Sequence, residues 1–407
     1  MRAAYLAPFV SIAVLITVPA FGGSASLTLL TTQTAADVTV DEFGRTLVLT
    51  GSNSGNGGQF IYEDGLYDFI GNARVRSMSV DGTAVAGTYR NSDSIEEAAR
   101  WTSLGGFEGL GSLPNALSCP SISSGYGITA DGSTVCGLSW DGCNGRGFIW
   151  TEADGMQELE VVGDGRNRAT AISADGSTIV GFGQGDFSRS AAAWNADGTA
   201  LLFDGSNGGE LEGLTPDGNL LVGIYASKAT YWTECEGFVE LGSLDPNEGA
   251  RARGVSADAR TIVGSSGSLL SGGFTAFVWT PERGMESLQD RLVGLGVEVP
   301  AGVTLEIANA VTDDGSTVVG QAFFADAKKG VFENRAFIAT LPDAEPSCPA
   351  DLNRDGAVGF ADLTALLNKW GPCVCSGPAA CLEDLDVDGS VGFSDLTTLL
   401  NAWGPCV

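Results

Sequence analysis

Histidine is absent from all 407 residues of the chain, and lysine and arginine together number 21 against 50 aspartates and glutamates. Without histidine, a Ser-His-Asp triad, a Cys-His dyad and a histidine-ligated zinc site are excluded, so any catalysis would rest on carboxylates, lysine, tyrosine or a metal. The formal net charge of −29 argues against nucleic acid as a partner, because a phosphate backbone is bound by a basic surface. The balance fits a solvated extracellular protein, a cation binder, or both.

Long apolar runs are also missing after the N-terminus, which reads MRAAYLAPFVSIAVLITVPAFGGSAS. One arginine precedes an apolar run of roughly 15 residues, and small residues follow, which is the layout of a secretory signal peptide. A transmembrane anchor is the alternative, but the run is short for a membrane span. We therefore expect residues 1–25 to be a signal peptide and the mature protein to be extracellular or attached to the cell surface, without a membrane span.

The middle of the chain repeats one pattern, in which an Asp-Gly pair precedes a run rich in Thr, Val and Ile. An aromatic stretch such as RGFIWT (146–151) follows in each later unit. A degenerate first copy and six full copies are DVTVDEFGRTLVLTG (37–51), SMSVDGTAVAG (77–87), GITADGSTVCG (127–137), AISADGSTIVG (171–181), GLTPDGNLLVG (213–223), GVSADARTIVG (254–264) and AVTDDGSTVVG (310–320). Self-similarity at such a period indicates a repeat architecture.

We interpret each unit as four short β-strands. Asp and Gly tolerate the positive φ angles of a tight hairpin, and no stretch of the array shows competing helical periodicity. Four-stranded units of roughly 40–45 residues are typical of propeller blades, and a β-solenoid is the alternative. The last unit lacks a fourth strand, whereas SLTLLTT (26–32) is a lone strand before the first. The sequence predicts an all-β fold, a seven-bladed β-propeller of four-stranded blades over residues 26–342, closed by its N-terminal strand.

The units resemble the HAF-type extracellular repeats of bacteria over roughly residues 37–341, through S-x-D-G-x-x-V-x-G and the aromatic strand after it. The resemblance implies a propeller-like extracellular domain. In place of the His-Ala-Phe that names the family, this chain has Thr275-Ala276-Phe277 and Arg335-Ala336-Phe337, so no histidine role carries over. The pattern S-x-D-G-x-x-V-x-G is also faintly similar to the Asp-box of sialidases, but its glycine follows the aspartate directly. We interpret these aspartates as turn residues.

After a linker at 343–347, DLNRDGAVGFADLTALLNKWGPC (351–373) returns 33 residues later as DLDVDGSVGFSDLTTLLNAWGPC (384–406). Side-chain oxygens at positions 1, 3, 5 and 12, glycine at 6 and a backbone carbonyl at 7 suit Ca²⁺, which takes six to eight oxygen ligands. Two amphipathic helices with acidic turns are the alternative, but two matches at a fixed offset favour two Ca²⁺ sites. The predicted ligands are Asp351, Asn353, Asp355, Ala357 and Asp362, and Asp384, Asp386, Asp388, Ser390 and Asp395.

A helix follows each loop, FADLTALLNKW and FSDLTTLLNAW, with Leu363, Leu366, Leu367 and Trp370 expected on one face of the first. Because no helix precedes either loop, the duplicated loop-then-helix pattern resembles a dockerin over residues 348–407. Dockerins anchor secreted proteins to cohesin receptors. The resemblance implies a small α-helical domain that calcium folds, whose helices present the receptor-binding face and in which either copy can face the receptor.

Nine cysteines are present, an odd number, and export makes disulfides permissible. The duplication predicts one pair per copy, Cys348–Cys373 and Cys381–Cys406, and this cysteine frame departs from the cellulosomal dockerin pattern. Cys375 is left over. Cys136 and Cys143 form a further candidate pair across a hairpin, which the sequence leaves open.

These features favour a non-catalytic secreted binding or display protein, attached through its tail to a cohesin-like receptor or cell-surface anchor. The alternatives are a dockerin-bearing glycoside hydrolase that degrades polysaccharide and a structural matrix component. A hydrolase needs two carboxylates about 5–10 Å apart in a cleft. The candidate acids are Glu96, Glu97, Glu234, Glu236, Glu282 and Glu286, and none stands out from solvated loop charge. A carboxylate pair in the propeller channel together with exposed aromatic side chains would favour the enzyme.

Overall fold

The structure is a computed structural model of the whole chain. It describes residues 24–52, 57–114, 121–140, 144–184, 188–268, 273–326, 329–342, 350–352, 357–373, 383–386 and 389–405. The predicted linker and all but the last two residues of the predicted signal peptide lie outside these ranges. No helix in the described part of the chain is long and apolar enough to cross a membrane.

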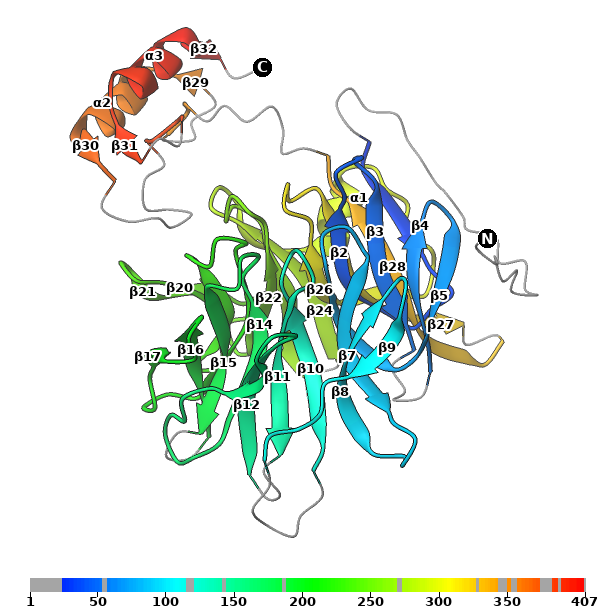
Figure 1. Cartoon of the computed structure of the whole chain (residues 1–407). Helices are drawn as coiled ribbons and strands as arrows, with labels where there is room; N and C mark the ends of the chain where they lie inside the picture. The colour runs from blue at the N-terminus through cyan, green and yellow to red at the C-terminus, as the bar shows by residue number, and fades with distance from the viewer. Residues whose placement is uncertain are drawn as a thin grey trace.

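Seven four-stranded antiparallel sheets form a propeller, which confirms the predicted fold (Figure 1). The first blade is β2 (Thr34–Val40), β3 (Thr46–Gly51), β4 (Gly58–Glu63) and β5 (Leu66–Asn72). The second to fourth are β6 (Arg74–Met78), β7 (Ala84–Arg90), β8 (Glu96–Thr102) and β9 (Gly106–Gly109); β10 (Ser123–Ile128), β11 (Thr134–Trp140), β12 (Gly145–Thr151) and β13 (Gly155–Glu158); and β14 (Asn167–Ile172), β15 (Thr178–Gln184), β16 (Arg189–Asn195) and β17 (Ala200–Phe203).

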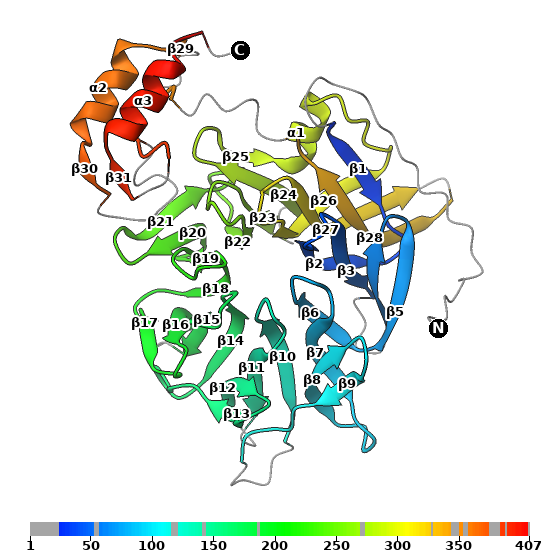
Figure 2. The same ribbon diagram turned by 45° about the horizontal axis from the view of Figure 1, so that its top comes forward.

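The fifth and sixth blades are β18 (Gly209–Leu214), β19 (Leu221–Tyr225), β20 (Lys228–Thr233) and β21 (Gly237–Gly242); and β22 (Ala250–Val255), β23 (Ile262–Ser268), β24 (Gly273–Thr280) and β25 (Gly284–Ser287). The seventh combines β26 (Val303–Val311), β27 (Thr317–Asp326) and β28 (Val331–Thr340) with the N-terminal strand β1 (Ser26–Leu29). The first strand of each blade lies innermost, so that β2, β6, β10, β14, β18, β22 and β26 surround the centre (Figure 2).

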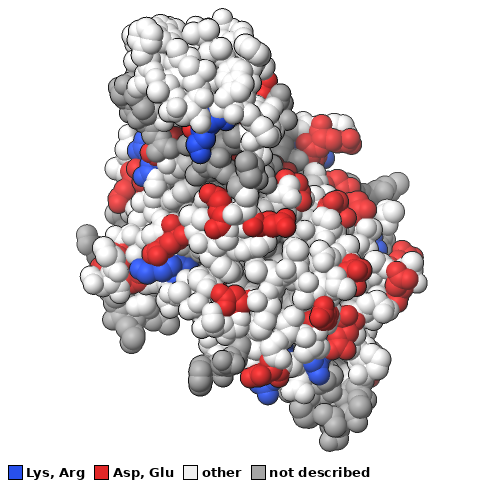
Figure 3. All heavy atoms as spheres, turned by 90° about the vertical axis from the view of Figure 1, so that its left-hand side faces the viewer, with Lys and Arg blue, Asp and Glu red and all other residues white. Residues whose placement is uncertain are grey.

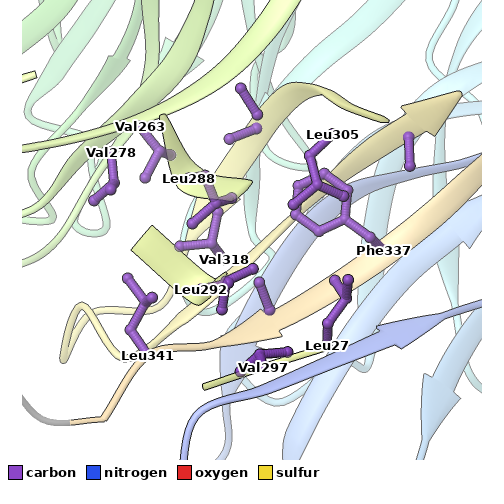
Figure 4. Packing of buried hydrophobic residues seen from close by; sticks show 14 of the residues in the cluster. Leu27, Val263, Val278, Leu288, Leu292, Val297, Leu305, Val318, Phe337 and Leu341 are labelled. Atoms are coloured by element: carbon purple, nitrogen blue, oxygen red, sulfur yellow. The ribbon is translucent and has the colours of Figure 1, made fainter. Parts of the chain in front are cut away.

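Ring closure follows the prediction. β1 pairs antiparallel with β28 in the register Ser26↔Thr340 to Leu29↔Phe337, across more than 300 residues of sequence. Leu27 packs into the large core cluster of the last two blades (Figure 4). Pairing the first and last strands of the propeller in one sheet leaves no open edge between the first and last blades, which is the usual reason for such closure.

The Asp-Gly pairs form the turn between the first and second strands, as predicted. In the fourth blade Asp175 Oδ1 accepts hydrogen bonds from Ser173 Oγ at 2.8 Å and from the Ser177 N–H at 2.9 Å. Gly176 has a φ of 78°, in the left-handed region that glycine adopts at no steric cost. The sixth blade has Ala259 instead, at a φ of 58°.

The glycine that closes each repeat lies on the second strand, against the backbone of the inner strand. A Cβ placed on Gly181 would lie 1.9 Å from the Arg168 carbonyl oxygen. The same clash, at 2.0 Å or less, recurs for Gly264 with Arg251 and for Gly320 with Ile307. A bulge in the inner strand accompanies this contact, as between Ala169 and Ala171. The repeated glycine therefore fixes how the inner strand presents its side chains to the channel.

Aromatic residues of the third strand hold the blades together. Trp101 of the second blade packs with Leu47 and Leu49 of the first. Trp150 of the third blade packs with Ala84 and Ala86 of the second. Burial of such rings contributes roughly 2–3 kcal/mol each. Each repeat is therefore stable only beside its neighbours, which is the property of repeat architectures that the sequence pattern indicated.

One expectation for this region was wrong. No helix was expected within the repeats, yet α1 (Leu288–Gly294) follows β25. Ser287 caps it by accepting a hydrogen bond from the Asp290 N–H, and Leu288 and Leu292, four residues apart, enter the core cluster shown in Figure 4. Seven residues are too few to produce a recognisable helical period, so the packing of two leucines decides the conformation.

The tail contains two matching halves, β29 (Ala357–Val358), α2 (Phe360–Asn368) and β30 (Gly371–Pro372), then β31 (Ser390–Val391), α3 (Phe393–Asn401) and β32 (Gly404–Pro405). The strands pair crosswise: Ala357↔Pro405 joins the start of the first half to the end of the second, and Pro372↔Ser390 does the reverse. Its small core consists of Ala350, Val358, Leu366, Val391 and Leu399.

Candidate functional site

The second loop of the tail brings three predicted ligands together. Carboxylate oxygens of Asp384, Asp386 and Asp395 all lie within 4.8 Å of one another. Two oxygens bound at about 2.4 Å to one ion are at most about 4.8 Å apart, so the cluster has the dimensions of a Ca²⁺ site. Like charges at this spacing repel one another unless a cation lies between them. The donor set therefore fits the ion that the sequence predicts.

Asp395, at position 12, is completely buried. Its Oδ1 accepts the N–H groups of Leu385 at 2.7 Å and Asp386 at 3.2 Å, and its Oδ2 accepts that of Gly392 at 2.6 Å. The Gly389 N–H, at position 6, donates to Asp384 Oδ2 at 2.9 Å. These bonds fold the loop back on itself, so that its first and last ligands face a common centre.

The first loop is described in part. Asp362, equivalent to Asp395, is likewise completely buried and accepts the Gly359 N–H at 2.7 Å. Asp351 is the first residue of this loop. Ala357 and Ser390, at position 7 of the two loops, each begin a tail strand. Asn353, Asp355 and Asp388 lie outside the described residues, so their predicted ligand roles stay predictions.

The two halves of the tail expose the same apolar side chains. Phe360 and Phe393 are 80% and 79% exposed, and Trp370 and Trp403 are both 41% exposed. Each phenylalanine meets the tryptophan of the other half edge to face, with ring centroids 5.1 Å apart. The predicted apolar helix face is thus divided: Leu366 is buried, whereas Leu367 and Trp370 are largely exposed, because two short helices bury only one row of side chains against each other.

The cysteines give one correction. Cys136 is a free, completely buried thiol in a blade core, so the candidate pair with Cys143 is not present. Burial raises the pKa of Cys136 to about 12, which keeps the thiol protonated and unreactive. Of the two pairs predicted for the tail, Cys348, Cys381 and Cys406 lie outside the described residues, and both pairings stay predictions.

A second candidate site, which sequence reasoning missed, is the central channel. Each inner strand directs two alternate side chains toward it, at five and seven residues before the repeat aspartate. These residues are Thr34 and Ala36, Arg74 and Arg76, Ser124 and Tyr126, Arg168 and Thr170, Glu210 and Glu212, Arg251 and Arg253, and Ile307 and Asn309. All but Ser124 line a cavity of about 600 Å³. Counting back from each repeat aspartate would have found them in the sequence.

Arginines and glutamates form paired contacts around the channel. Glu210 binds Arg168 and, at 3.2 Å, Arg189; Glu212 binds Arg251 and, at 3.2 Å, Arg253. Both glutamate side chains are at most 10% exposed. Each of these two glutamates is therefore bound to two guanidinium groups, an arrangement that holds neighbouring blades together.

Two aspartates also line this cavity. Burial raises the pKa of Asp37 to about 6, although the N–H groups of Met78 and Val38 donate to it. Burial likewise raises the pKa of Asp313, with a further contribution from Asp314. Asp313 lies at the end of the channel that carries the aspartate turns, where backbone hydrogen bonds link neighbouring blades. One of these bonds runs from the Ala257 N–H to the Asp313 carbonyl at 2.9 Å.

The acids considered for hydrolysis are not assembled in the channel. Glu96 forms ion pairs with Arg74 and Arg90, Glu282 with Arg260, and Glu286 with Arg283. Neither these nor Glu97, Glu234 and Glu236 line the cavity. Of the carboxylates that do line it, Glu210 and Glu212 come from one strand and are bound by arginines, whereas Asp37 and Asp313 belong to the first and last blades.

No protein-family model matches the chain, and no curated protein matches it. Among solved structures, TolB from Acinetobacter baumannii is 14% identical, with a TM-score of 0.38 over 61% of this chain and 60% of that one. This chain thus spans less than two thirds of that protein. An oligogalacturonate lyase from Vibrio parahaemolyticus is 12% identical, with a TM-score of 0.49 over 82% and 98% of the two chains. Likeness at this level carries no argument about ligand or activity.

Proposed function

We propose that the chain is a secreted, non-catalytic binding or display protein whose duplicated tail is a dockerin-like module with two Ca²⁺ sites. The carboxylate cluster of Asp384, Asp386 and Asp395, with oxygens within 4.8 Å of one another, carries the proposal. Ca²⁺ would neutralise these charges and join the loop to the start of α3. The tail would then attach the propeller to a cohesin-like receptor or another cell-surface anchor.

The exposed aromatic pairs support a docking role for the tail. Phe360 with Trp403 and Phe393 with Trp370 place two equivalent apolar patches on a module of about 60 residues. Exposed apolar patches rimmed by polar residues commonly mark protein-binding surfaces. Because the two halves match in exposure and contacts, either would present nearly the same patch to a receptor. The disulfides predicted from the duplication would hold both halves in the extracellular environment.

Calorimetric titration of the full chain with Ca²⁺ tests the metal sites. Two bound ions per chain are expected, and Asp395→Asn should weaken one of them by about 100-fold, equivalent to about 3 kcal/mol for a removed buried charge partner. Asp362→Asn should weaken the other. Asp68→Asn, at an exposed position of β5, is the matched control. Calcium affinities left unchanged by both tail substitutions would contradict the assignment.

Retention on immobilised cohesin domains, with calcium and with chelator, tests the docking role. The full chain should be retained only with calcium, and a chain ending at 342 should not be retained at all. If the metal titration succeeds while no cohesin or cell-surface fraction retains the protein, calcium binding stands and the anchoring role is wrong.

A further inference from the structure

We propose that the central channel of the propeller binds a small doubly charged oxyanion, either two carboxylates on one molecule or a single sulfate or phosphate group. The site would consist of Arg76, Arg168, Arg251 and Arg253 with Tyr126. This inference concerns the propeller alone, and it stands whether or not the tail binds calcium.

The distribution of charge is the first observation. The chain carries 50 acidic against 21 basic residues, and on the face shown in Figure 3 the scattered acidic patches are more extensive than the basic ones. The lining of the channel shifts this balance, with five arginines against the four acids Glu210, Glu212, Asp37 and Asp313. Arg74 is bound by Glu96 at 2.6 Å, which leaves four arginines beside Glu210 and Glu212. A negatively charged protein thus concentrates positive charge at its axis, where low-dielectric walls strengthen the field.

The state of the individual guanidinium groups is the second observation. Among the described residues, Arg76 makes no ion pair; its contact is with the Tyr126 ring, 5.8 Å from the ring centroid. Arg168 lies over the same ring at 5.0 Å. The buried Nε donors of Arg168 and Arg253 have no hydrogen-bond partner among the described residues. Because these two Nε atoms have almost no exposed surface, a ligand would be bound by the other guanidinium nitrogens, above all those of Arg76.

The arginines also crowd one another. Burial lowers the pKa of Arg253, Glu212 opposes this shift, and the charges of Arg251 and Arg76 lower the pKa further. The side chain of Arg253 is nevertheless 30% exposed, and that exposed surface faces the channel. A bound dianion, together with Glu210 and Glu212, would balance the charges of Arg76, Arg168, Arg251 and Arg253. The two cavity aspartates lie toward the aspartate-turn end: Asp313 is two residues beyond the end of β26, and Asp37 accepts the Met78 N–H at 2.9 Å at the end of β6.

The cavity has the size and chemistry of a small-molecule site. Its volume of about 600 Å³ lies within the range of about 300–1,000 Å³ found for ligand pockets. Thr170, Asn309 and Gln321 add hydroxyl and amide groups to the lining. At the aspartate-turn end, backbone bonds from Val80 to Ala130 and from Ala130 to Ala174, both 3.0 Å, draw the blades together. A ligand would therefore be held within the wider part, beside the arginines.

The test is calorimetric titration of the full chain at low ionic strength with succinate, sulfate and the neutral succinamide. One saturable site is expected for succinate or sulfate and none for succinamide; which dianion binds more tightly identifies the source of the charge. Arg76→Gln and Arg253→Gln should each weaken binding at least 10-fold. Arg283→Gln, which removes an exposed pair with Glu286, is the matched control and should change nothing.

Two results would overturn the proposal: no saturable binding of either dianion, or equal affinity in the channel variants and the control. Arg253→Gln leaves Glu212 with one arginine and could unfold the blade interface. Arg76→Gln breaks no ion pair among the described residues, so its affinity decides the question if the other variant fails to fold. Far-ultraviolet circular dichroism verifies the fold of each variant.

Discussion

The propeller and the tail are both built from repeats, yet different interactions hold their repeats together. In the propeller, every sheet packs on two neighbours, and β1 closes the ring by pairing with β28. In the described part of the tail, two strand pairs of two residues each and five buried apolar side chains join the halves. A large repeat array can therefore rely on its apolar core, whereas a small one needs further cross-links.

Buried carboxylates show the same contrast. In the propeller, Asp41 and Glu210 are buried beside arginines, which supply the opposite charge. In the tail, Asp395 is buried among backbone N–H groups, beside two further aspartates. Protein cations satisfy the first kind of site, and a bound cation is our proposal for the second. The difference predicts that the two regions respond to different perturbations.

Deleting residues 26–32 should have the largest effect, and only on the propeller. The deletion removes the buried Leu27 and Leu30, at about 2–3 kcal/mol each, and exposes the edge of β28. We expect a loss of about 5 kcal/mol in the free energy of unfolding, measured by urea denaturation with tryptophan fluorescence. The calcium titration of the tail should remain unchanged. An unaltered urea midpoint would show that β1 does not hold the ring closed.

Removing the predicted tail disulfides should act on the tail alone. Each pair, Cys348–Cys373 and Cys381–Cys406, would close a loop of 26 residues. A loop of this length contributes about 3–4 kcal/mol, so a double Cys→Ser change of one pair should destabilise the tail by that amount. Peptide mapping without reduction identifies the pairs. Links between the two copies would contradict the assignment, and a loss of propeller stability would contradict the independence of the two regions.

Gly181→Ala should damage the propeller in one blade. Its Cβ would lie 1.9 Å from the Arg168 carbonyl oxygen, so the inner strand must move. We expect a loss of about 2–3 kcal/mol, typical of overpacking against a backbone that relaxes little. Gly155→Ala is the comparison, because a Cβ on Gly155 would meet nothing within 4 Å, whereas its φ of 67° is strained for alanine. It therefore separates backbone strain from collision. Equal losses in both variants would show that collision is not the cause.

Asp175→Ala should have the smallest effect, about 1 kcal/mol for two lost hydrogen bonds at an exposed turn. The Ser177 N–H, followed by the Ser177 and Ser173 hydroxyls, lowers the pKa of Asp175 below its ordinary value. The stabilisation is therefore present above the unfolded-state pKa of about 3.9 and is lost as the pH falls through the lower folded-state pKa. The difference between variant and wild type in urea midpoint should shrink from pH 7 to pH 2.

The opposite sign applies to Asp37, whose folded-state pKa is about 6. Its raised pKa means that stability increases as the pH falls from about 6 to the unfolded-state value of about 3.9. The acid response of the whole propeller therefore combines opposed contributions, which is why the Asp175 comparison uses a difference. A difference that stays constant with pH would show that the turn carboxylate contributes no pH-dependent stability.

Much of the propeller could be predicted from local sequence. The repeat line indicated seven blades, the Asp-Gly turns, the tryptophan strands and the missing strand that β1 supplies. The helix α1 was missed, because two leucines in seven residues carry no period. The free thiol of Cys136 also required the fold, since only the blade core shows that its side chain is sealed from any partner.

The channel shows a different limit. Arg76, Arg168 and Arg253 looked like scattered basic residues in an acidic chain, and the repeats give no hint that they share an axis until the blades are arranged in a ring. Their spacing of five or seven residues before the repeat aspartate was present in the sequence, but its meaning depends on the inner strand facing inward. The bulge opposite the repeated glycine sets that orientation.

The sequence by itself determined the repeat, the turn chemistry and the predicted ligand spacing of the tail, because each depends on residues within about twelve positions of one another. Only the tertiary structure decided which side chains meet: β1 beside β28, arginines from three different blades around one cavity, and a fully buried Asp395 beside Asp384 and Asp386. The physical reason is that local hydrogen bonds and φ preferences act along the chain, whereas burial and charge pairing depend on distances in space that the closed ring and the paired halves create.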